Sequence, residues 1–159
     1  MTPYPFTIGV GIDGLLPMGV VGPGFEVDTS SLGHDNNNQF ARPDMIGRLL
    51  SLPDHFRDQA VRHGVPLHQV PNLVYTAMSL PRGGVFDVDA NEDGQIDNPW
   101  RPPHHLHRFG TDADLRVNNI PRHLRDELET AVLTTSLFFA VRKESPENPT
   151  ANHWHLRTR

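Results

Sequence analysis

The sequence of 159 residues predicts an α+β fold with a small, largely antiparallel sheet, flanking helices and long loops. Three observations lead to this prediction. Apolar residues with the helical and the strand period alternate in mixed order rather than as regular strand–helix–strand units. The chain contains 13 Gly and 15 Pro, and only 36% of its residues are hydrophobic, which favours short elements joined by loops. The length suits a single core and excludes two independent enzymes.

Residues 1–40 are rich in Gly, Asn, Ser and Asp, and we expect a loop-rich N-terminal extension there. It should contain one or two short strands and a long loop over 28–39. The apolar stretch 6–25 holds Asp13, two prolines and six glycines, so we expect no membrane span in it. It also lacks the basic start and the small-residue cleavage pattern of a signal peptide.

Residues 43–63 carry the signals of a helix. Pro53 fits a first helical turn, with Asp54 near the positive end of the helix. Gly64 is typical of the residue that follows a helix end. The face that we expect to be buried consists of Phe56, Ala60 and Val61.

The rest of the chain predicts further short elements. Residues 67–80 contain an apolar run typical of a buried strand, made of Leu73, Val74, Tyr75, Ala77 and Met78. Residues 81–106 have the composition of a loop. Residues 111–117 alternate between polar and apolar side chains and predict a short strand.

Pro121 is expected to open a second helix, because apolar residues then recur at steps of three and four, namely Leu124, Leu128, Ala131 and Val132. Residues 137–141 either continue this helix or form a strand. Residues 152–158 alternate again and predict a final strand.

The charged residues and the cysteine count exclude several classes of site. The chain has 14 Lys and Arg against 19 Asp and Glu, a formal charge of −5, so we expect no nucleic-acid partner and no nuclease activity. Cysteine is absent, so disulfides and cysteine-ligated zinc are excluded. Ten histidines are available instead, and any transition metal would be held by histidine and carboxylate ligands.

Two short segments concentrate histidine and aspartate. His153 and His155 are two residues apart in a predicted strand, so their side chains should face one site. Asp112 and Asp114 should do likewise on a neighbouring strand, with His107 in the loop that enters it. Three such ligands with a fourth position for water form the open coordination of catalytic zinc. Zinc lowers the pKa of its bound water to about 7.

The segment His107-Arg-Phe-Gly110-Thr-Asp-Ala-Asp114 followed by His153-Trp-His155 resembles zinc peptidases of the lysostaphin, D-Ala-D-Ala carboxypeptidase and hedgehog group. It is most similar to the penicillin-insensitive murein endopeptidases and the D,D-carboxypeptidases. The resemblance implies that His107, Asp114 and His155 are the zinc ligands and that Gly110 is the turn glycine. It also implies that His153 acts near the metal on the attacking water or the oxyanion.

Ser79-Leu-Pro-Arg82 is weakly similar to the Ser-x-x-Arg of the carboxypeptidases. This similarity implies that Arg82 is a catalytic residue that holds the substrate or its developing charge, a role that suits a planar guanidinium. With these motifs, residues 41–159 resemble a zinc D,D-peptidase-like catalytic domain, with a hedgehog- or D,D-peptidase-like fold.

The sequence departs from the carboxypeptidase pattern at the general base. The family places a Glu three residues before the last zinc ligand, and Asn152 stands at that position here. We expect His153 to take over as the base, with Glu144 and Glu147 as alternatives in a loop.

An acidic loop over 87–97 resembles a calcium loop of the EF-hand or dockerin type, with Gly94 at the turn position. Trp100 stands where the usual bidentate Glu would be. A solvated acidic turn is the alternative interpretation. The expected calcium ligands are Asp89, Asn91, Asp93 and Asp97.

The sequence therefore predicts a zinc-dependent metallopeptidase that hydrolyses peptide bonds of bacterial peptidoglycan through a zinc-activated water. Zinc is the expected cofactor, with calcium as a second one, and a peptide or peptidoglycan is the expected partner. The resemblance implies an extracytoplasmic location. The alternative is a non-enzymatic calcium-binding or adhesion module of a larger extracellular protein.

Overall fold

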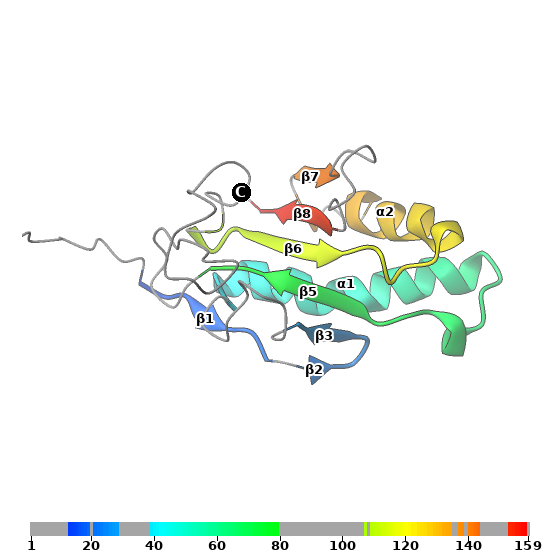
Figure 1. The fold of residues 1–159 in the computed structure, drawn as a ribbon, viewed down its shortest axis with the longest axis horizontal. Helices are drawn as coiled ribbons and strands as arrows, with labels where there is room; N and C mark the ends of the chain where they lie inside the picture. The colour runs from blue at the N-terminus through cyan, green and yellow to red at the C-terminus, as the bar shows by residue number, and fades with distance from the viewer. Residues whose placement is uncertain are drawn as a thin grey trace, which may run out of the picture.

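The computed structural model describes residues 13–19, 21–28, 39–79, 107, 109–134, 137–138, 140–143 and 153–158. These residues form two layers, a six-stranded sheet and two α-helices that cover one of its faces (Figure 1). The predicted α+β class with a largely antiparallel sheet is confirmed at this level. Neither described helix is both long and apolar enough to cross a bilayer.

The six strands of the main sheet lie in the order β2-β3-β5-β6-β8-β7. Neighbouring strands are antiparallel, except that β3 and β5 are parallel. The strands are β2 (Val21–Gly22), β3 (Phe25–Val27), β5 (Leu73–Ala77), β6 (Asp112–Arg116), β7 (Ala140–Lys143) and β8 (His153–Arg157). A separate two-stranded sheet joins β1 (Leu16–Pro17) to β4 (Phe40–Ala41).

The described part of the predicted N-terminal extension contains three strands, β1 to β3, and the first residue of β4, rather than one or two strands. Each is only two or three residues long, too short to show a strand period in the sequence. Because β3 pairs with β5, residues 25–27 belong to the main sheet. Most of the loop predicted over 28–39 lies outside the described residues.

The first helix, α1, spans Pro43–Arg62. The prediction that Pro53 lies in its first turn is wrong, because Pro43 occupies that turn and Pro53 lies inside the helix. Asp44, rather than Asp54, is the acidic residue near the positive end of the helix. Gly64 follows the helix with a φ of 85°, a left-handed conformation that favours glycine.

The buried face of α1 extends over its whole length, and its spacing of three and four residues explains why the helix is longer than a start at residue 53 would give. It comprises Met45, Leu49, Leu52, Phe56 and Ala60. Val61 was expected on this face but is 48% exposed. It follows Ala60 directly, and successive helical residues point about 100° apart.

A proline inside a helix removes the backbone N–H that would bond to the carbonyl four residues earlier, and for Pro53 that carbonyl belongs to Leu49. The buried hydroxyl of Tyr75 donates a hydrogen bond of 2.7 Å to this same carbonyl oxygen. β5 therefore supplies the donor that α1 lacks, and the sheet and the helix are tied together at this point.

The predicted strand within 67–80 is β5, preceded by a short 3-10 helix at Leu67–Gln69. The five apolar residues predicted to be buried here all are. Tyr75 and Leu73 pack into the core with the helices, while Val74 lies outside that cluster. A strand whose two faces are both covered reads as a continuous apolar run, as the sequence indicated.

The second helix, α2, spans Arg125–Thr134 and follows a 3-10 helix at Arg122–Leu124 that Pro121 precedes. Its predicted apolar face is confirmed, since Leu124, Leu128, Ala131 and Val132 are all buried. Of the two alternatives for 137–141, the structure has a strand, β7, which begins at Ala140. The strands predicted over 111–117 and 152–158 are β6 and β8.

Candidate metal centre

β6 and β8 form an antiparallel pair whose register sets the site. Asp114 lies opposite His155, and Arg116 lies opposite His153. The residues between them, Leu115 and Trp154, belong to the core cluster beside the helices. Because neighbouring residues in a strand alternate in direction, the polar side chains lie on the sheet face away from the helices.

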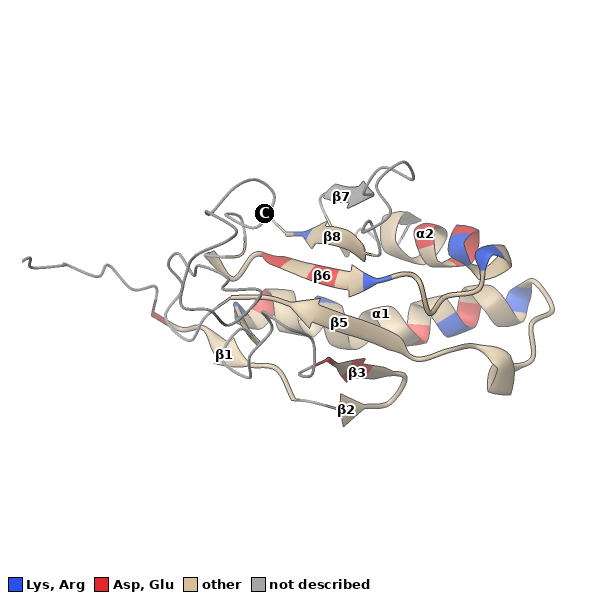
Figure 2. Ribbon diagram, viewed as in Figure 1, with Lys and Arg blue, Asp and Glu red and all other residues tan. Residues whose placement is uncertain are grey.

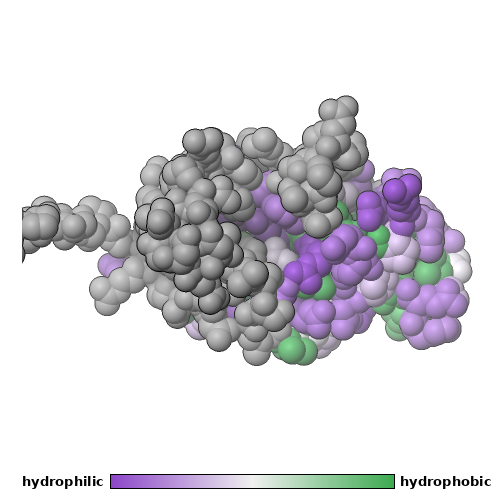
Figure 3. Space-filling model, in the orientation of Figure 1, coloured by the Kyte–Doolittle hydropathy of each residue, from purple (hydrophilic) through white to green (hydrophobic). Residues whose placement is uncertain are grey.

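The strands that form the site carry charged residues. Figure 2 shows acidic and basic positions along β6 and a basic position near the end of β8. In Figure 3 the visible described residues are mostly hydrophilic, with small apolar patches. Asp114 and His155 are nevertheless buried. Buried titratable groups that gather on one sheet face are candidates for a functional site.

His107 reaches the same place from the turn before β6. The N–H of Gly110 donates to the carbonyl of His107 at 3.0 Å, and the N–H of Arg42 donates to the carbonyl of Gly110 at 2.9 Å. Gly110 has a φ of 68°, and a Cβ there would lie 2.4 Å from Cδ2 of Leu15. Only glycine fits both the backbone conformation and this space. Gly110 therefore permits the tight turn that connects His107 to β6.

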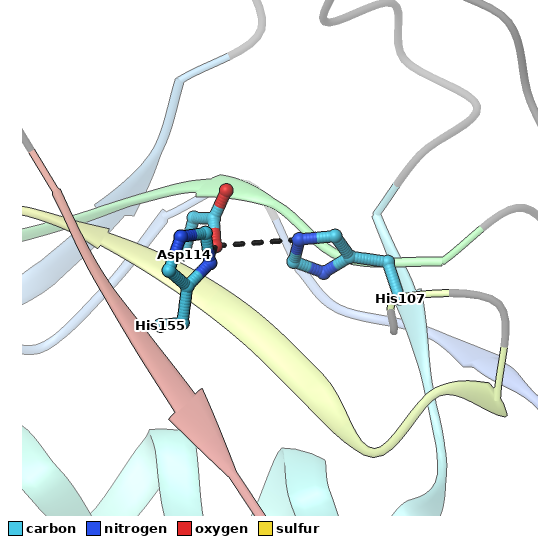
Figure 4. Close-up of side chains that lie close together, drawn as sticks. All are labelled: His107, Asp114 and His155. Carbon is cyan, nitrogen blue, oxygen red and sulfur yellow. Dashed lines mark ion pairs between the residues drawn. The ribbon is translucent and has the colours of Figure 1, made fainter. Parts of the chain in front are cut away.

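His107, Asp114 and His155 converge, each from a different segment (Figure 4). Nε2 of His107 lies 3.3 Å from Oδ1 of Asp114, and Nδ1 of His155 lies 2.6 Å from the same oxygen. One ligand atom from each residue lies within 4.8 Å of the other two. The three residues that the sequence singled out as metal ligands thus form a buried group that could hold a metal ion.

His153 borders the buried group without belonging to it. Its Nε2 lies 3.5 Å from Oδ2 of Asp114, and its ring centroid lies 4.7 Å from that of His155 in an edge-to-face arrangement. Its side chain is 21% exposed, against 5% for His155. His153 is therefore the histidine of this site that solvent reaches most readily.

The Asp114 carboxylate and the neighbouring imidazoles stabilise one another's charged forms. Burial acts to lower the pKa of His107, but the Asp114 carboxylate outweighs it and the pKa lies above its ordinary value. Burial acts to raise the pKa of Asp114, but His107 and His155 hold it well below its ordinary value. Asp114 is therefore ionised at neutral pH and offers an anionic oxygen between two imidazoles.

The donor set decides which cations the group suits. Two imidazole nitrogens and one carboxylate oxygen match zinc and similar transition metals. Calcium and magnesium prefer sites made mainly of oxygen ligands. Among the described residues the group has three members, and a site with three protein ligands keeps a coordination position open for water.

Asp112 was expected to face the same site as Asp114, and its side chain is instead held by Arg157. Nε of Arg157 donates to Oδ1 of Asp112 at 2.6 Å, and the Thr111 hydroxyl donates to Oδ2 at 2.8 Å. On the other side of Asp114, Arg116 pairs with Asp28. Sequence reasoning missed both arginines, although each lies two residues from a predicted ligand in its strand.

Several predicted site residues lie outside the described part of the chain. They are Arg82, the calcium candidates Asp89, Asn91, Asp93 and Asp97, the alternative bases Glu144 and Glu147, and Asn152, which stands at the position of the family's Glu. Ser79 is described and buried, at the end of the segment that leads to Arg82. The roles assigned to the residues of this paragraph remain predictions.

Comparison with known proteins assigns no family to the chain. No protein-family model matches the sequence, and no curated protein matches it.

Proposed function

We propose that the chain is a zinc-dependent metallopeptidase that cleaves peptide bonds of bacterial peptidoglycan through a zinc-activated water. The observation that carries the proposal is the buried group of His107, Asp114 and His155 with the more exposed His153 at its border. These are the positions that the resemblance to the D,D-peptidase and hedgehog group singles out. The proposal includes that group's fold for residues 41–159, and an extracytoplasmic location.

The three proposed ligands position and partly neutralise the metal ion. His107, Asp114 and His155 would hold the ion, and the negative charge of Asp114 would offset part of its charge. When bound, zinc supplies a Lewis acid and a water molecule whose pKa is about 7. Burial keeps bulk water away from the ligands and strengthens their electrostatic effect at the reacting bond.

His153 is the proposed proton carrier. Its Nε2 lies on the Asp114 side of the group, and its exposed fraction of 21% lets a substrate approach the ring. Nε2 can accept a proton from the attacking water and return it to the leaving nitrogen, the two steps that peptide hydrolysis requires. Arg82 is proposed to hold the substrate or its developing charge.

The test is digestion of purified peptidoglycan by the zinc-loaded protein, followed by mass spectrometry of the released fragments. We expect the wild type to release peptide fragments, Asp114→Ala to release none, and His153→Ala to release far fewer than the wild type. His123→Ala is the matched control, because this exposed histidine lies in a 3-10 helix outside the group. Intact peptidoglycan with the wild type, or full release by Asp114→Ala, would contradict the proposal.

The proposed calcium loop needs its own experiment. We propose calcium binding by Asp89, Asn91, Asp93 and Asp97, as the sequence pattern suggests. Calcium titration of the wild type and of Asp93→Ala tests it. Binding by both proteins alike, or by neither, would refute the loop as a calcium site and with it the alternative of a calcium-binding module.

A further inference from the structure

We propose that Asp112 and Arg157 form a positioning pair for the metal centre. Their ion pair holds the start of β6 so that the backbone carbonyl of Asp112 orients the ring of His107. The inference rests on the proposed metal site and adds residues that the ligand motif does not contain. Neither residue is a ligand, and both act through His107.

The first step is the fixation of the Asp112 side chain. It receives a hydrogen bond of 2.6 Å from Nε of Arg157 and one of 2.8 Å from the Thr111 hydroxyl. The side chain of Asp112 is 4% exposed and that of Arg157 is 35% exposed. Hydrogen bonds to a buried charged group are among the stronger ones, and the loss of one partner leaves a buried carboxylate poorly compensated. Asp112 is therefore held in one position.

The second step leads from Asp112 to the ligand. Nδ1 of His107 lies 3.4 Å from the carbonyl oxygen of Asp112, while its Nε2 faces Asp114 at 3.3 Å. A neutral imidazole that donates from Nδ1 keeps its lone pair on Nε2, which is the form that binds a metal through Nε2. With a metal on Nε2, Nδ1 would keep its proton and donate it to the carbonyl of Asp112, which thereby fixes the orientation of the His107 ring.

The third step is the link between the two ligand strands. Asp112 lies opposite Arg157 in the register. This pair is the next one along the same sheet face from the pair of Asp114 and His155. The N–H of Thr158 also donates to the carbonyl of Thr111 at 2.9 Å, just outside the strands. These contacts close the end of the β6–β8 pair at which His107 enters. They keep the carbonyl and the two strand-borne ligands in register.

The chain offers a matched control for this pair. Arg116 and Asp28 form a second ion pair that involves β6, on the opposite side of Asp114. That pair ties β6 to the residue after β3 instead of to β8. Both arginines are about one-third exposed, at 30% for Arg116 and 35% for Arg157. Arg116→Met therefore removes a comparable ion pair without touching the end of β6 that bears the His107 contact.

The main experiment measures the zinc affinity of the full chain by competition with a chelator. We expect Arg157→Met to bind zinc about 10- to 100-fold more weakly than the wild type, the usual range for partners that orient a ligand. The zinc affinity of Arg116→Met should stay within about threefold of the wild-type value, even if its melting temperature falls as far as that of Arg157→Met. Arg157→Lys should recover part of the loss. Asp112→Ala should weaken binding similarly, and adding Arg157→Met to it should cost little more, because both changes break one contact.

A second readout reports on His107 directly. In ¹⁵N NMR spectra of the zinc-loaded protein, where the metal takes the place of a proton at Nε2, we expect a well-resolved Nδ1–H signal of His107 in the wild type and one that exchanges faster with water in Arg157→Met. Wild-type affinity together with wild-type exchange of this proton in Arg157→Met, or an equal loss of affinity in Arg116→Met, would overturn the inference. A wild type that binds no zinc would instead contradict the proposed function.

Discussion

The hydroxyl of Tyr75 donates a hydrogen bond of 2.7 Å to the backbone carbonyl of Leu49, in the middle of α1. This carbonyl has no helical donor, since the residue four positions on is Pro53. Burial also raises the pKa of Tyr75 far above its ordinary value, so the hydroxyl stays protonated and remains a donor. β5, which pairs with β6, thus provides a hydrogen-bond donor to α1.

Tyr75→Phe should lower the free energy of unfolding by about 1–3 kcal/mol, because a buried carbonyl loses its donor. Urea unfolding measures this change. In a Pro53→Ala background the helix regains the missing N–H, so the same substitution should cost clearly less there. An equal cost in both backgrounds would show that the two residues are not coupled.

Gly110→Ala should destabilise the protein by more than Gly64→Ala. Both glycines have a positive φ, which costs a side chain about 1 kcal/mol. A Cβ at Gly64 would have nothing within 4 Å, whereas at Gly110 it would lie 2.4 Å from Leu15 and 3.0 Å from the backbone nitrogen of Arg42. Thermal melts of both variants give the difference. Zinc affinity should fall only in Gly110→Ala, because this turn carries His107; equal effects would argue against the close packing of the turn.

The stability of the protein should fall in mild acid partly through Glu127. Burial acts to raise its pKa, but the hydrogen bond to His63 at 3.1 Å, its own backbone N–H and the charge of His123 bring the pKa below the ordinary value of 4.5. A carboxyl group with a lowered folded-state pKa stabilises the fold above its unfolded-state pKa. This contribution disappears as the pH falls through the folded-state value.

Melting temperatures of the wild type and Glu127→Gln test this, measured between about pH 7 and pH 3. The wild type should be the more stable one near neutral pH, and the two curves should converge below the ordinary pKa of Glu. His63→Ala should reproduce part of the effect, since it removes the partner on α1. Curves that stay parallel down to the lowest pH would refute the role of Glu127.

His153→Ala should separate metal binding from catalysis. Because His153 borders the group but is not one of its three members, zinc affinity should change by less than about tenfold, an effect typical of a neighbouring group. Hydrolysis of peptidoglycan should fall by about 10²- to 10⁴-fold, the usual contribution of a general acid–base group. Zinc titration and fragment release, measured on the same preparation, decide the point. A variant that loses zinc would make His153 a ligand instead.

Much of the fold could be predicted because its elements are periodic. The apolar spacing of α2 and the continuous apolar run of β5 indicate structures that packing enforces, and both are confirmed. The helix signals over 43–63 agree with α1, but the prediction of a first turn at Pro53 is wrong. An internal proline is tolerated there because Tyr75, far along the chain, provides a donor, and this is a tertiary effect that no local pattern contains.

The candidate ligands could be found from spacing, because residues two apart in a strand share a face. Asp114 and His155 indeed lie opposite each other. Arg157 was not predicted as part of the site, since its contact with Asp112 depends on the register between β6 and β8. The sequence of a single strand does not reveal that register.

The most direct test of the metal centre is the zinc content of protein purified without added metal, measured by inductively coupled plasma mass spectrometry. Wild type and Asp114→Ala should be prepared in parallel, with circular dichroism to verify that both are folded. We predict about one zinc ion per wild-type chain and almost none in the variant, since the one anionic ligand of the group is lost. A folded wild type that contains no zinc and gains no thermal stability from added zinc would contradict the account, as would a variant with undiminished zinc.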